Sequence, residues 1–304
     1  MSLRAARRCA VILAVTIAIP ANTALAQTPN RNAAKVSASI SGINQFDADL
    51  DDGGNAGWSG FIISGAYSQP VAPRFDLGVT LRYDYQKWRF SDPVAFGGAS
   101  PWQNLNAIAF GLSLDYAYQD DLRLSAAPVF GWSYATGASA SNAMNYGAVL
   151  SMTKLFSPRL MLGGGVSVFR QIDETKVFPF VIVQWQIDDR WRLANPFRAG
   201  PAGGAGIELA YAVNDTWEIA GGGAYRSSRF RLDDSGIAPG GVGESRLFPA
   251  FVRATHKMGA QTTLEIYAGV SAGGHISATD KQGHKSATDY QSAPAIGLTL
   301  AHRL

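Results

Sequence analysis

Residues 74–90 read RFDLGVTLRYDYQKWRF, and from Phe75 to Gln86 apolar side chains alternate with charged or small ones. The apolar members are Phe75, Leu77, Val79, Leu81, Tyr83 and Tyr85. A period of two is that of a β-strand, because successive side chains of a strand point to opposite faces. The stretch therefore predicts a strand with one apolar face and one polar face.

The same alternation recurs along most of the chain. It is clear in residues 106–118 and 122–134 and weaker in nine further stretches, with a poorly marked opening strand at 36–43. The weaker stretches are 61–67, 146–152, 160–168, 177–187, 207–213, 217–225, 248–254, 264–270 and 296–304. Strands of about 9 to 13 residues suit a tilted crossing of a bilayer, whereas strands of soluble domains are commonly about 5 or 6 residues long. This pattern predicts an all-β, antiparallel, up-and-down transmembrane β-barrel in residues 35–304.

The connections between these stretches alternate between short and long. Residues 119–121 and 214–216 are short connections, whereas 91–103 and 275–291 are long ones. Membrane barrels place short turns at the periplasmic end and longer loops outside, so the two kinds must follow in strict succession. That succession requires a short strand at residues 191–194. With this strand the barrel has about 14 strands. If this strand and one partner strand are both rejected, the barrel has 12 strands.

The N-terminus has the charged, apolar and small-residue regions of a secretory signal peptide. Three arginines precede an apolar run at residues 9–19, and Ala24 and Ala26 precede the expected cleavage site. We therefore expect a signal peptide at 1–26, a short periplasmic tail at 27–34 and export to the cell outer membrane. Without the signal's three arginines, 23 basic residues balance 23 acidic ones, which gives no support to a nucleic-acid partner. The lone cysteine, Cys9, leaves with the signal.

Aromatic residues gather beside the short turns, where a membrane barrel places its interface aromatics. The expected interface set is Tyr116, Tyr118, Trp185, Trp191, Tyr211 and Trp217. The chain ends on an alternating strand that finishes with the apolar Leu304. We expect outer-membrane lipid as one partner and the barrel assembly machinery, through this C-terminal strand, as another.

Taken together, these features resemble outer-membrane β-barrel proteins of Gram-negative bacteria over essentially the whole mature chain. Residues 195–198, which read NPFR, and residues 225–234, which read YRSSRFRLDD, resemble a porin-like barrel family of unassigned function. The resemblance implies a barrel in the outer membrane and leaves the transported solute, if there is one, undefined. The oligomeric state is not readable from the chain.

An outward apolar face places a set of charged residues on the lumen side. The expected lumen-lining residues are Asp76, Arg82, Asp84, Asp115, Arg123, Glu208, Glu218, Arg226 and Glu265. Charges inside a barrel require either water or ion-pair partners. Many of the other inward positions are Gly, Ala or Ser, which leave volume for water and favour a passive diffusion channel for small polar solutes.

The alternatives are a structural or surface-recognition barrel without an open pore and, less favoured, a membrane-embedded lipid hydrolase. The four histidines are too scattered for a metal site, and none is paired with a serine in a way that indicates nucleophilic catalysis. We therefore expect no enzyme activity, no catalytic residues, no metal and no cofactor.

Overall fold

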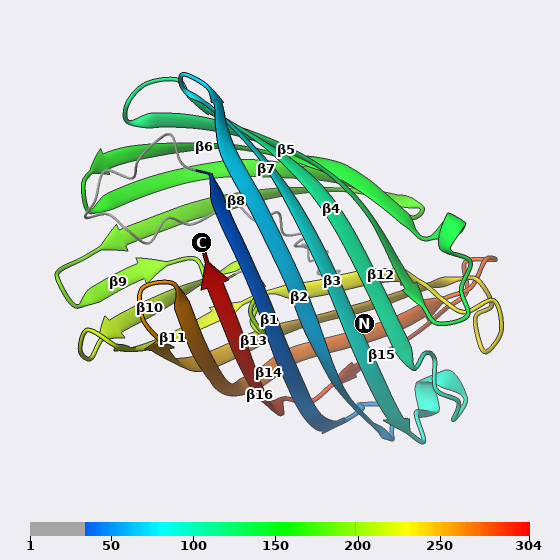
Figure 1. The fold of residues 1–304 in the computed structure, drawn as a ribbon. Helices are drawn as coiled ribbons and strands as arrows, with labels where there is room; N and C mark the ends of the chain where they lie inside the picture. Colours follow the sequence, from blue (N-terminus) through cyan, green and yellow to red (C-terminus); the bar gives the residue numbers. More distant parts are fainter. Residues whose placement is uncertain (1–33, 198) are drawn as a thin grey trace, which may run out of the picture.

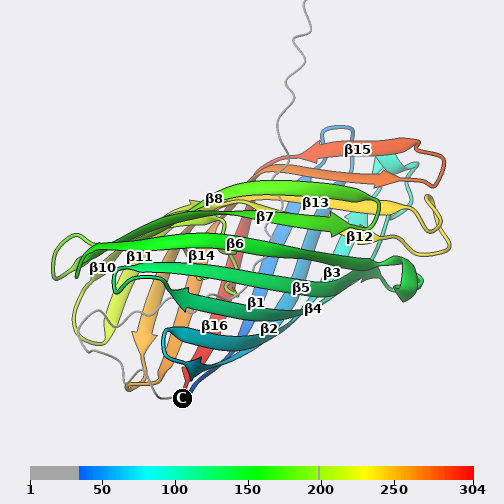
Figure 2. The same ribbon diagram turned by 90° about the horizontal axis from the view of Figure 1, so that it is seen from above.

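The computed structural model describes residues 34–197 and 199–304, which form a closed antiparallel β-barrel (Figures 1 and 2). The expected signal peptide and residues 27–33 of the expected tail lie outside the described residues. The strands are β1 Lys35–Asp49, β2 Asn55–Ala72, β3 Phe75–Ser91, β4 Asn104–Ala117, β5 Leu122–Ala135, β6 Met144–Ser157, β7 Leu160–Gln171, β8 Glu174–Gln186, β9 Trp191–Ala194, β10 Gly206–Ala212, β11 Trp217–Ala224, β12 Arg226–Arg231, β13 Val242–Lys257, β14 Thr262–Thr279, β15 Lys285–Tyr290 and β16 Ala293–Arg303. Two short 3-10 helices, η1 Val94–Phe96 and η2 Ala140–Asn142, lie in the loops.

The barrel wall has 14 strand positions. β12 prolongs β11, because both pair with β13, and β15 and β16 pair with successive parts of β14. The ring closes where β1 pairs with β16, from Ser37 opposite Arg303 to Gln45 opposite Ala295. The prediction of about 14 strands is confirmed, and with it the short strand at residues 191–194, which is β9.

The outer face of the barrel is apolar. Leu81 is 59% exposed and Val181 is 68% exposed, although both lie inside regular strands. Polar side chains on the opposite face are buried instead, as Ser41 and Thr299 show with no exposure at all. This is the reverse of a soluble domain, and such a belt fits hydrocarbon outside the wall. Within the described residues, no helix is both long and apolar enough to cross a bilayer.

The two ends of the barrel differ in their connections. At one end, here called the turn end, successive strands are joined by tight turns such as the one closed by Asp188. The backbone N–H groups of Trp191 and Arg190 each donate to the Asp188 carboxylate at 2.8 Å, and these bonds lower the pKa of Asp188. The opposite end, here called the loop end, carries η1, η2 and most of the longer connections.

Strands at the loop end run further than the sequence pattern indicates. Residues 275–291 were expected to be a long loop, but most of them form the end of β14 and the whole of β15. His275 pairs with Asp289 in this hairpin, and only residues 280–284 remain as a turn. The composition of this stretch is polar, because the hairpin projects beyond the apolar belt, and polarity alone therefore indicated a loop.

Replacing Leu81 by arginine places a charge on the lipid face of β3. We expect the free energy of unfolding to fall by about 2–4 kcal/mol, the cost of a basic side chain near the bilayer midplane. Urea unfolding in lipid vesicles, followed by tryptophan fluorescence, measures the change. Ile237→Arg, in the loop between β12 and β13, is the matched control and should change stability by no more than about 0.5 kcal/mol. Equal costs for both variants would contradict the assignment of the lipid face.

Candidate functional site in the barrel lumen

The strand registers place all nine expected lumen residues on the inner face. They fall into three groups. The Arg253 group contains Glu208, Glu218 and Glu265. The Asp84 group contains Arg82, Asp84 and Arg226. The third group lies near the turn end, where Arg123 is 4.0 Å from Asp76 and Ser125 donates to Asp115 at 2.5 Å.

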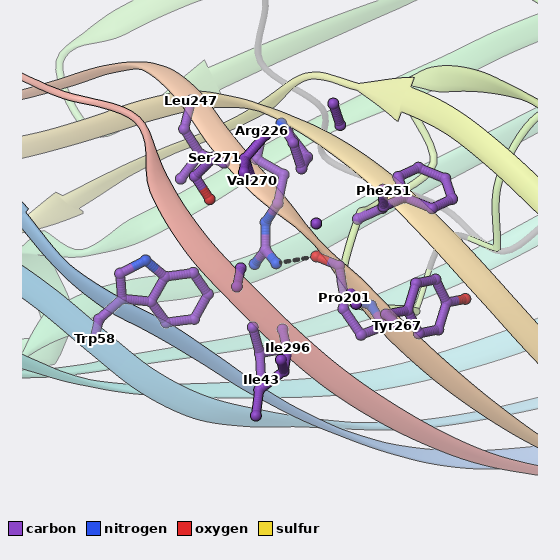
Figure 3. Close-up of a pocket in the computed structure, with 16 residues that line it drawn as sticks. Ile43, Trp58, Pro201, Arg226, Leu247, Phe251, Tyr267, Val270, Ser271 and Ile296 are labelled. Carbon is purple, nitrogen blue, oxygen red and sulfur yellow. Dashed lines mark hydrogen bonds between the residues drawn. The ribbon is translucent and has the colours of Figure 1, made fainter.

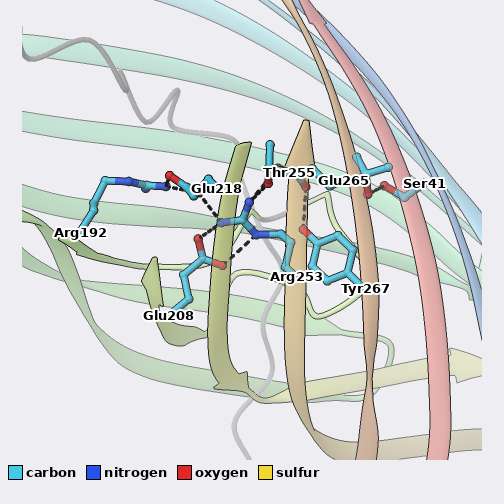
Figure 4. A network of polar contacts seen from close by, with 9 residues as sticks. Ser41, Arg192, Glu208, Glu218, Arg253, Thr255, Glu265 and Tyr267 are labelled. Carbon is cyan, nitrogen blue, oxygen red and sulfur yellow. Dashed lines mark hydrogen bonds and ion pairs between the residues drawn. The ribbon is translucent and has the colours of Figure 1, made fainter. Parts of the chain in front are cut away.

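The first group is built around Arg253, a residue of β13 that the sequence analysis did not single out (Figure 4). Its side chain is 4% exposed, and its guanidinium lies 2.6 Å from Glu208, 3.0 Å from Glu218 and 3.5 Å from Glu265. Arg253 also donates to the hydroxyl of Thr255. One guanidinium thus joins carboxylates from β10, β11 and β14 across neighbouring strands of the wall.

Two further side chains complete this group. Arg192 of β9 lies 2.9 Å from Glu218, and the Tyr267 hydroxyl donates to Glu265 at 2.6 Å. Arg192 was also missed by the sequence analysis. Counting inward positions along 191–194 and 248–254 would have found both arginines, because each lies at an inward position of its strand. Burial of so many charges is tolerated only because each meets an opposite charge or a hydrogen-bond partner.

The second group lies closer to the loop end and shares one carboxylate between two guanidinium groups. Asp84 is 3.2 Å from Arg82 and 3.8 Å from Arg226. The guanidinium of Arg226 also lies over the ring of Trp58, 5.3 Å from its centroid, in a cation–π contact. This group therefore marks the border between the charged part of the lumen and an aromatic part.

Aromatic side chains fill the lumen on the loop side of this border. We call Trp58, Trp88, Phe96, Trp102 and Phe230 the loop-end cluster; all five are buried. Trp102 is its centre, with ring centroids 5.6 Å from Trp88, 5.0 Å from Phe230 and 6.5 Å from Phe96. Inward aromatic residues at strand ends, together with loop residues, thus form an apolar core where the sequence analysis expected volume for water.

The described residues of the connection between β9 and β10, 195–197 and 199–205, turn into the lumen, and we call them the inward segment. Asn195 holds its base, accepting from the Val183 N–H at 2.9 Å and donating to the carbonyl of Gly206, also at 2.9 Å. Further along, Ser41 of β1 donates to the Ala199 carbonyl at 2.8 Å. Since β1 and β9 lie well apart in the ring, the segment reaches across the interior.

A small cavity lies beside the inward segment (Figure 3). Its volume is about 40 Å³, and its lining is mostly apolar, with Arg226 as its charged member. Trp58, Phe251 and Tyr267 contribute aromatic rings, and Pro201 and Ala202 of the inward segment form part of its wall. The cavity is therefore bounded by apolar side chains, by the buried cation Arg226 and by the inward segment.

Side-chain ion pairs join β8 to β12 and β13 near the loop end. Among the described residues, β8 pairs with β9 only over Gln184–Gln186, and its earlier part packs against β12 and β13 through side chains. Lys176 is 3.2 Å from Glu244, and Arg229 lies 2.5 Å from Glu244 and 3.5 Å from Glu174. Because the next residue, Phe230, contacts Trp102 in the lumen, β12 separates these ion pairs from the interior.

The expected interface aromatics lie on the outer face near the turn end. Tyr118, Trp185, Trp191 and Trp217 are exposed, whereas Tyr116 and Tyr211 are half-buried. Several of them pack in pairs: Trp191 with Tyr211 at 4.8 Å between ring centroids, and Tyr116 with Tyr118 at 6.4 Å. Within residues 34–197 and 199–304, no cluster of three or more His, Cys, Asp or Glu side chains could hold a metal ion.

Comparison with known proteins gives a family. A family model described as a domain of unknown function, DUF6268, matches residues 126–300. No curated protein matches the sequence. Among solved structures, the chain is similar to a FadL homologue of Pseudomonas aeruginosa, with 12% identity, a TM-score of 0.47 and coverage of 88% of this chain and 89% of the other.

Two other solved barrels illustrate the same level of similarity. An outer membrane channel from Pseudomonas putida F1 has 11% identity and a TM-score of 0.47, over 91% of this chain and 99% of the other. The toluene transporter TbuX of Ralstonia pickettii has 9% identity and a TM-score of 0.41, over 90% and 89%. At such identities no property of these proteins is carried over to this chain.

Replacing Arg253 by glutamine leaves three carboxylates close together without their shared cation. We expect a loss of about 3–5 kcal/mol in the free energy of unfolding, the usual cost of removing one partner from a buried ion-pair network. Urea unfolding in lipid vesicles measures it. Arg159→Gln, which breaks an exposed pair with Asp189, should cost about 0–1 kcal/mol. If Arg253→Gln lowers the free energy of unfolding by no more than Arg159→Gln does, the network contributes no stability.

Proposed function

The chain belongs to the DUF6268 family, a domain of unknown function, and we propose from its lumen that it is a gated outer-membrane channel for small solutes with a large apolar surface. In this proposal the loop end faces the outside of the cell, because longer connections of membrane barrels lie there. A solute then meets the loop-end cluster first and the charged groups afterwards.

The observation that carries this proposal is the apolar character of the loop-end half of the lumen. Trp58, Trp88 and Trp102 line it together with the other members of the loop-end cluster. A polar solute entering this region would lose its water and gain few hydrogen bonds, which costs several kcal/mol for each polar group. An apolar molecule gains by the same transfer, since its surface leaves water. The lining therefore favours apolar solutes over polar ones.

The barrel is closed in this arrangement. The loop-end cluster and the inward segment both occupy the interior, and Ala199 of the segment reaches Ser41 on the far wall. Passage therefore requires both the loop-end cluster and the inward segment to move. Passive diffusion of small polar solutes stays a prediction, and it too would require this movement.

The cellular setting of the proposal comes from the sequence and from the closing strand. Export by the expected signal peptide at 1–26 would deliver the chain to the periplasm. β16 ends the chain and closes the ring by pairing with β1, which fits its expected role as the segment presented to the assembly machinery. Outer-membrane lipid would then cover the apolar belt, which includes Leu81 and Val181.

A disulfide that fixes the inward segment tests the proposal. The double variant Ser41→Cys, Ala199→Cys introduces a thiol on each of the two residues that the bond between the Ser41 hydroxyl and the Ala199 carbonyl now holds together. Gram-negative cells expressing the full chain should take up the apolar dye N-phenyl-1-naphthylamine several-fold faster than cells with an empty vector. The oxidised double variant should lower influx to the vector level, and dithiothreitol should restore it, because residues 27–304 contain no other cysteine.

The second candidate is a structural barrel without a pore, favoured by the tightly packed loop-end cluster. It predicts equal dye influx with the wild-type chain, the oxidised variant and the empty vector. Hydrolysis of nitrocefin by a periplasmic β-lactamase reports polar solutes in the same cells. Faster nitrocefin hydrolysis without faster dye influx would instead support the polar diffusion channel and contradict the proposal.

A further inference from the structure

Arg226 is a buried cation held mainly by neutral groups. It is the first residue of β12, its side chain is 16% exposed, and it donates to the Pro201 carbonyl at 2.6 Å (Figure 3). Its contact with Asp84 is 3.8 Å long, beyond hydrogen-bond distance. The opposite side of the guanidinium meets the Trp58 ring. A guanidinium in such surroundings favours an anionic partner that accepts two of its hydrogen bonds at once.

The nearby charges leave room for such an anion. Asp84 is closer to Arg82 than to Arg226, and Gln86 also donates to Asp84. The carboxylate is thus shared, and a second carboxylate beside Arg226 would be attracted by two cations while facing one like charge. The acidic side chains of the Arg253 group are already bound by Arg253 and Arg192.

The cavity beside Arg226 defines the rest of the ligand. Its walls include the rings of Trp58, Phe251 and Tyr267 together with Leu247. Flat aromatic walls favour an aromatic ring, which stacks on them in offset or edge-to-face geometry. At about 40 Å³ the cavity has room for about three waters, so a ring enters only if Pro201 and its neighbours leave.

We infer that the lumen binds a small aromatic carboxylate at Arg226, and that the ligand's carboxylate replaces the Pro201 carbonyl and so releases the inward segment. A charged carboxylate forms stronger hydrogen bonds with a guanidinium than a neutral carbonyl does. The exchange therefore favours the ligand, and the ring occupies the space that Pro201 vacates. The inference rests on the proposed function for its role in transport, because it names one class of solute and an event that shifts the channel towards the open arrangement, which the unliganded channel reaches less often.

Besides the Arg226 bond, two further contacts hold the middle of the inward segment. The Ala199 carbonyl accepts from Ser41, and Pro201 packs so closely on Gly297 that a Cβ there would lie 2.5 Å from the Pro201 ring. Asn195 binds the base of the segment to β8 and β10. Release of the middle of the segment therefore requires that the ligand gain more at Arg226 than these two contacts lose, while Asn195 keeps the base of the segment in place.

Binding of benzoate to the purified full-length barrel in detergent is the first test. Isothermal titration should detect benzoate, with benzyl alcohol, a neutral molecule of similar shape, binding about tenfold more weakly or worse. Arg226→Gln should weaken benzoate binding to the level of benzyl alcohol, and Arg226→Lys should bind at an intermediate level. Arg159→Gln, in a turn far from the lumen, is the matched control. Heat-modifiable migration in gels confirms that each variant is folded.

Release of the segment is the second test. In Ala199→Cys the new thiol is buried under the wild-type arrangement, so a bulky maleimide should label it slowly. Benzoate should raise the labelling rate several-fold and benzyl alcohol should not. Adding Arg226→Gln should make labelling fast without any ligand and insensitive to benzoate.

Equal binding of benzoate and benzyl alcohol, or benzoate binding that survives Arg226→Gln, would overturn the site. Benzoate binding without faster labelling would overturn the coupling to the inward segment. Neither readout depends on transport. If benzoate binds and speeds labelling of the Ala199→Cys variant while dye influx stays at the vector level, the channel proposal fails and the binding site stands.

Discussion

The structure depends on one constraint: a backbone surrounded by hydrocarbon must satisfy its hydrogen bonds within the protein. A sheet meets this constraint only by closing on itself, since an open edge would leave a row of unpaired N–H and C=O groups. Here the first strand, β1, and the last, β16, pair over nine consecutive residues, from Ser37 to Gln45. Every other feature of the barrel follows from this closure.

Closure separates side chains into two environments. Outward residues such as Leu81 lie on the exposed apolar face, and inward ones such as Arg253 share an enclosed space with little access to water. Enclosed charges must then be balanced locally, which explains why three carboxylates surround Arg253. The aromatic loop-end cluster carries no charge, so its burial requires no ion-pair partner. The lumen thus has a charged part and an apolar part, with Arg226 at their border.

The wall is least regular around β9, and the features of functional interest meet there. β9 has four residues, so the edge of β8 beyond it lacks a neighbouring strand among the described residues. The Asn195 side chain replaces part of the missing ladder by bonding to Val183 and Gly206. The chain that would have continued β9 enters the lumen instead. The short strand β9 and the closed interior therefore have the same cause, which is that the chain leaves the wall after Ala194.

The sequence by itself determined the strand pattern and its two faces and limited the number of strands to about 14 or 12, because a period of two is a local property that each strand carries alone. The alternation in residues 74–90 and the parity that demanded a strand at 191–194 needed no tertiary information. Only the tertiary structure decided which inward residues meet. Arg253 joins Glu208 across 45 positions, and Ser41 meets Ala199 across 158. Such contacts depend on ring closure and on the path of residues 195–205, and neither leaves a periodic signal in the chain.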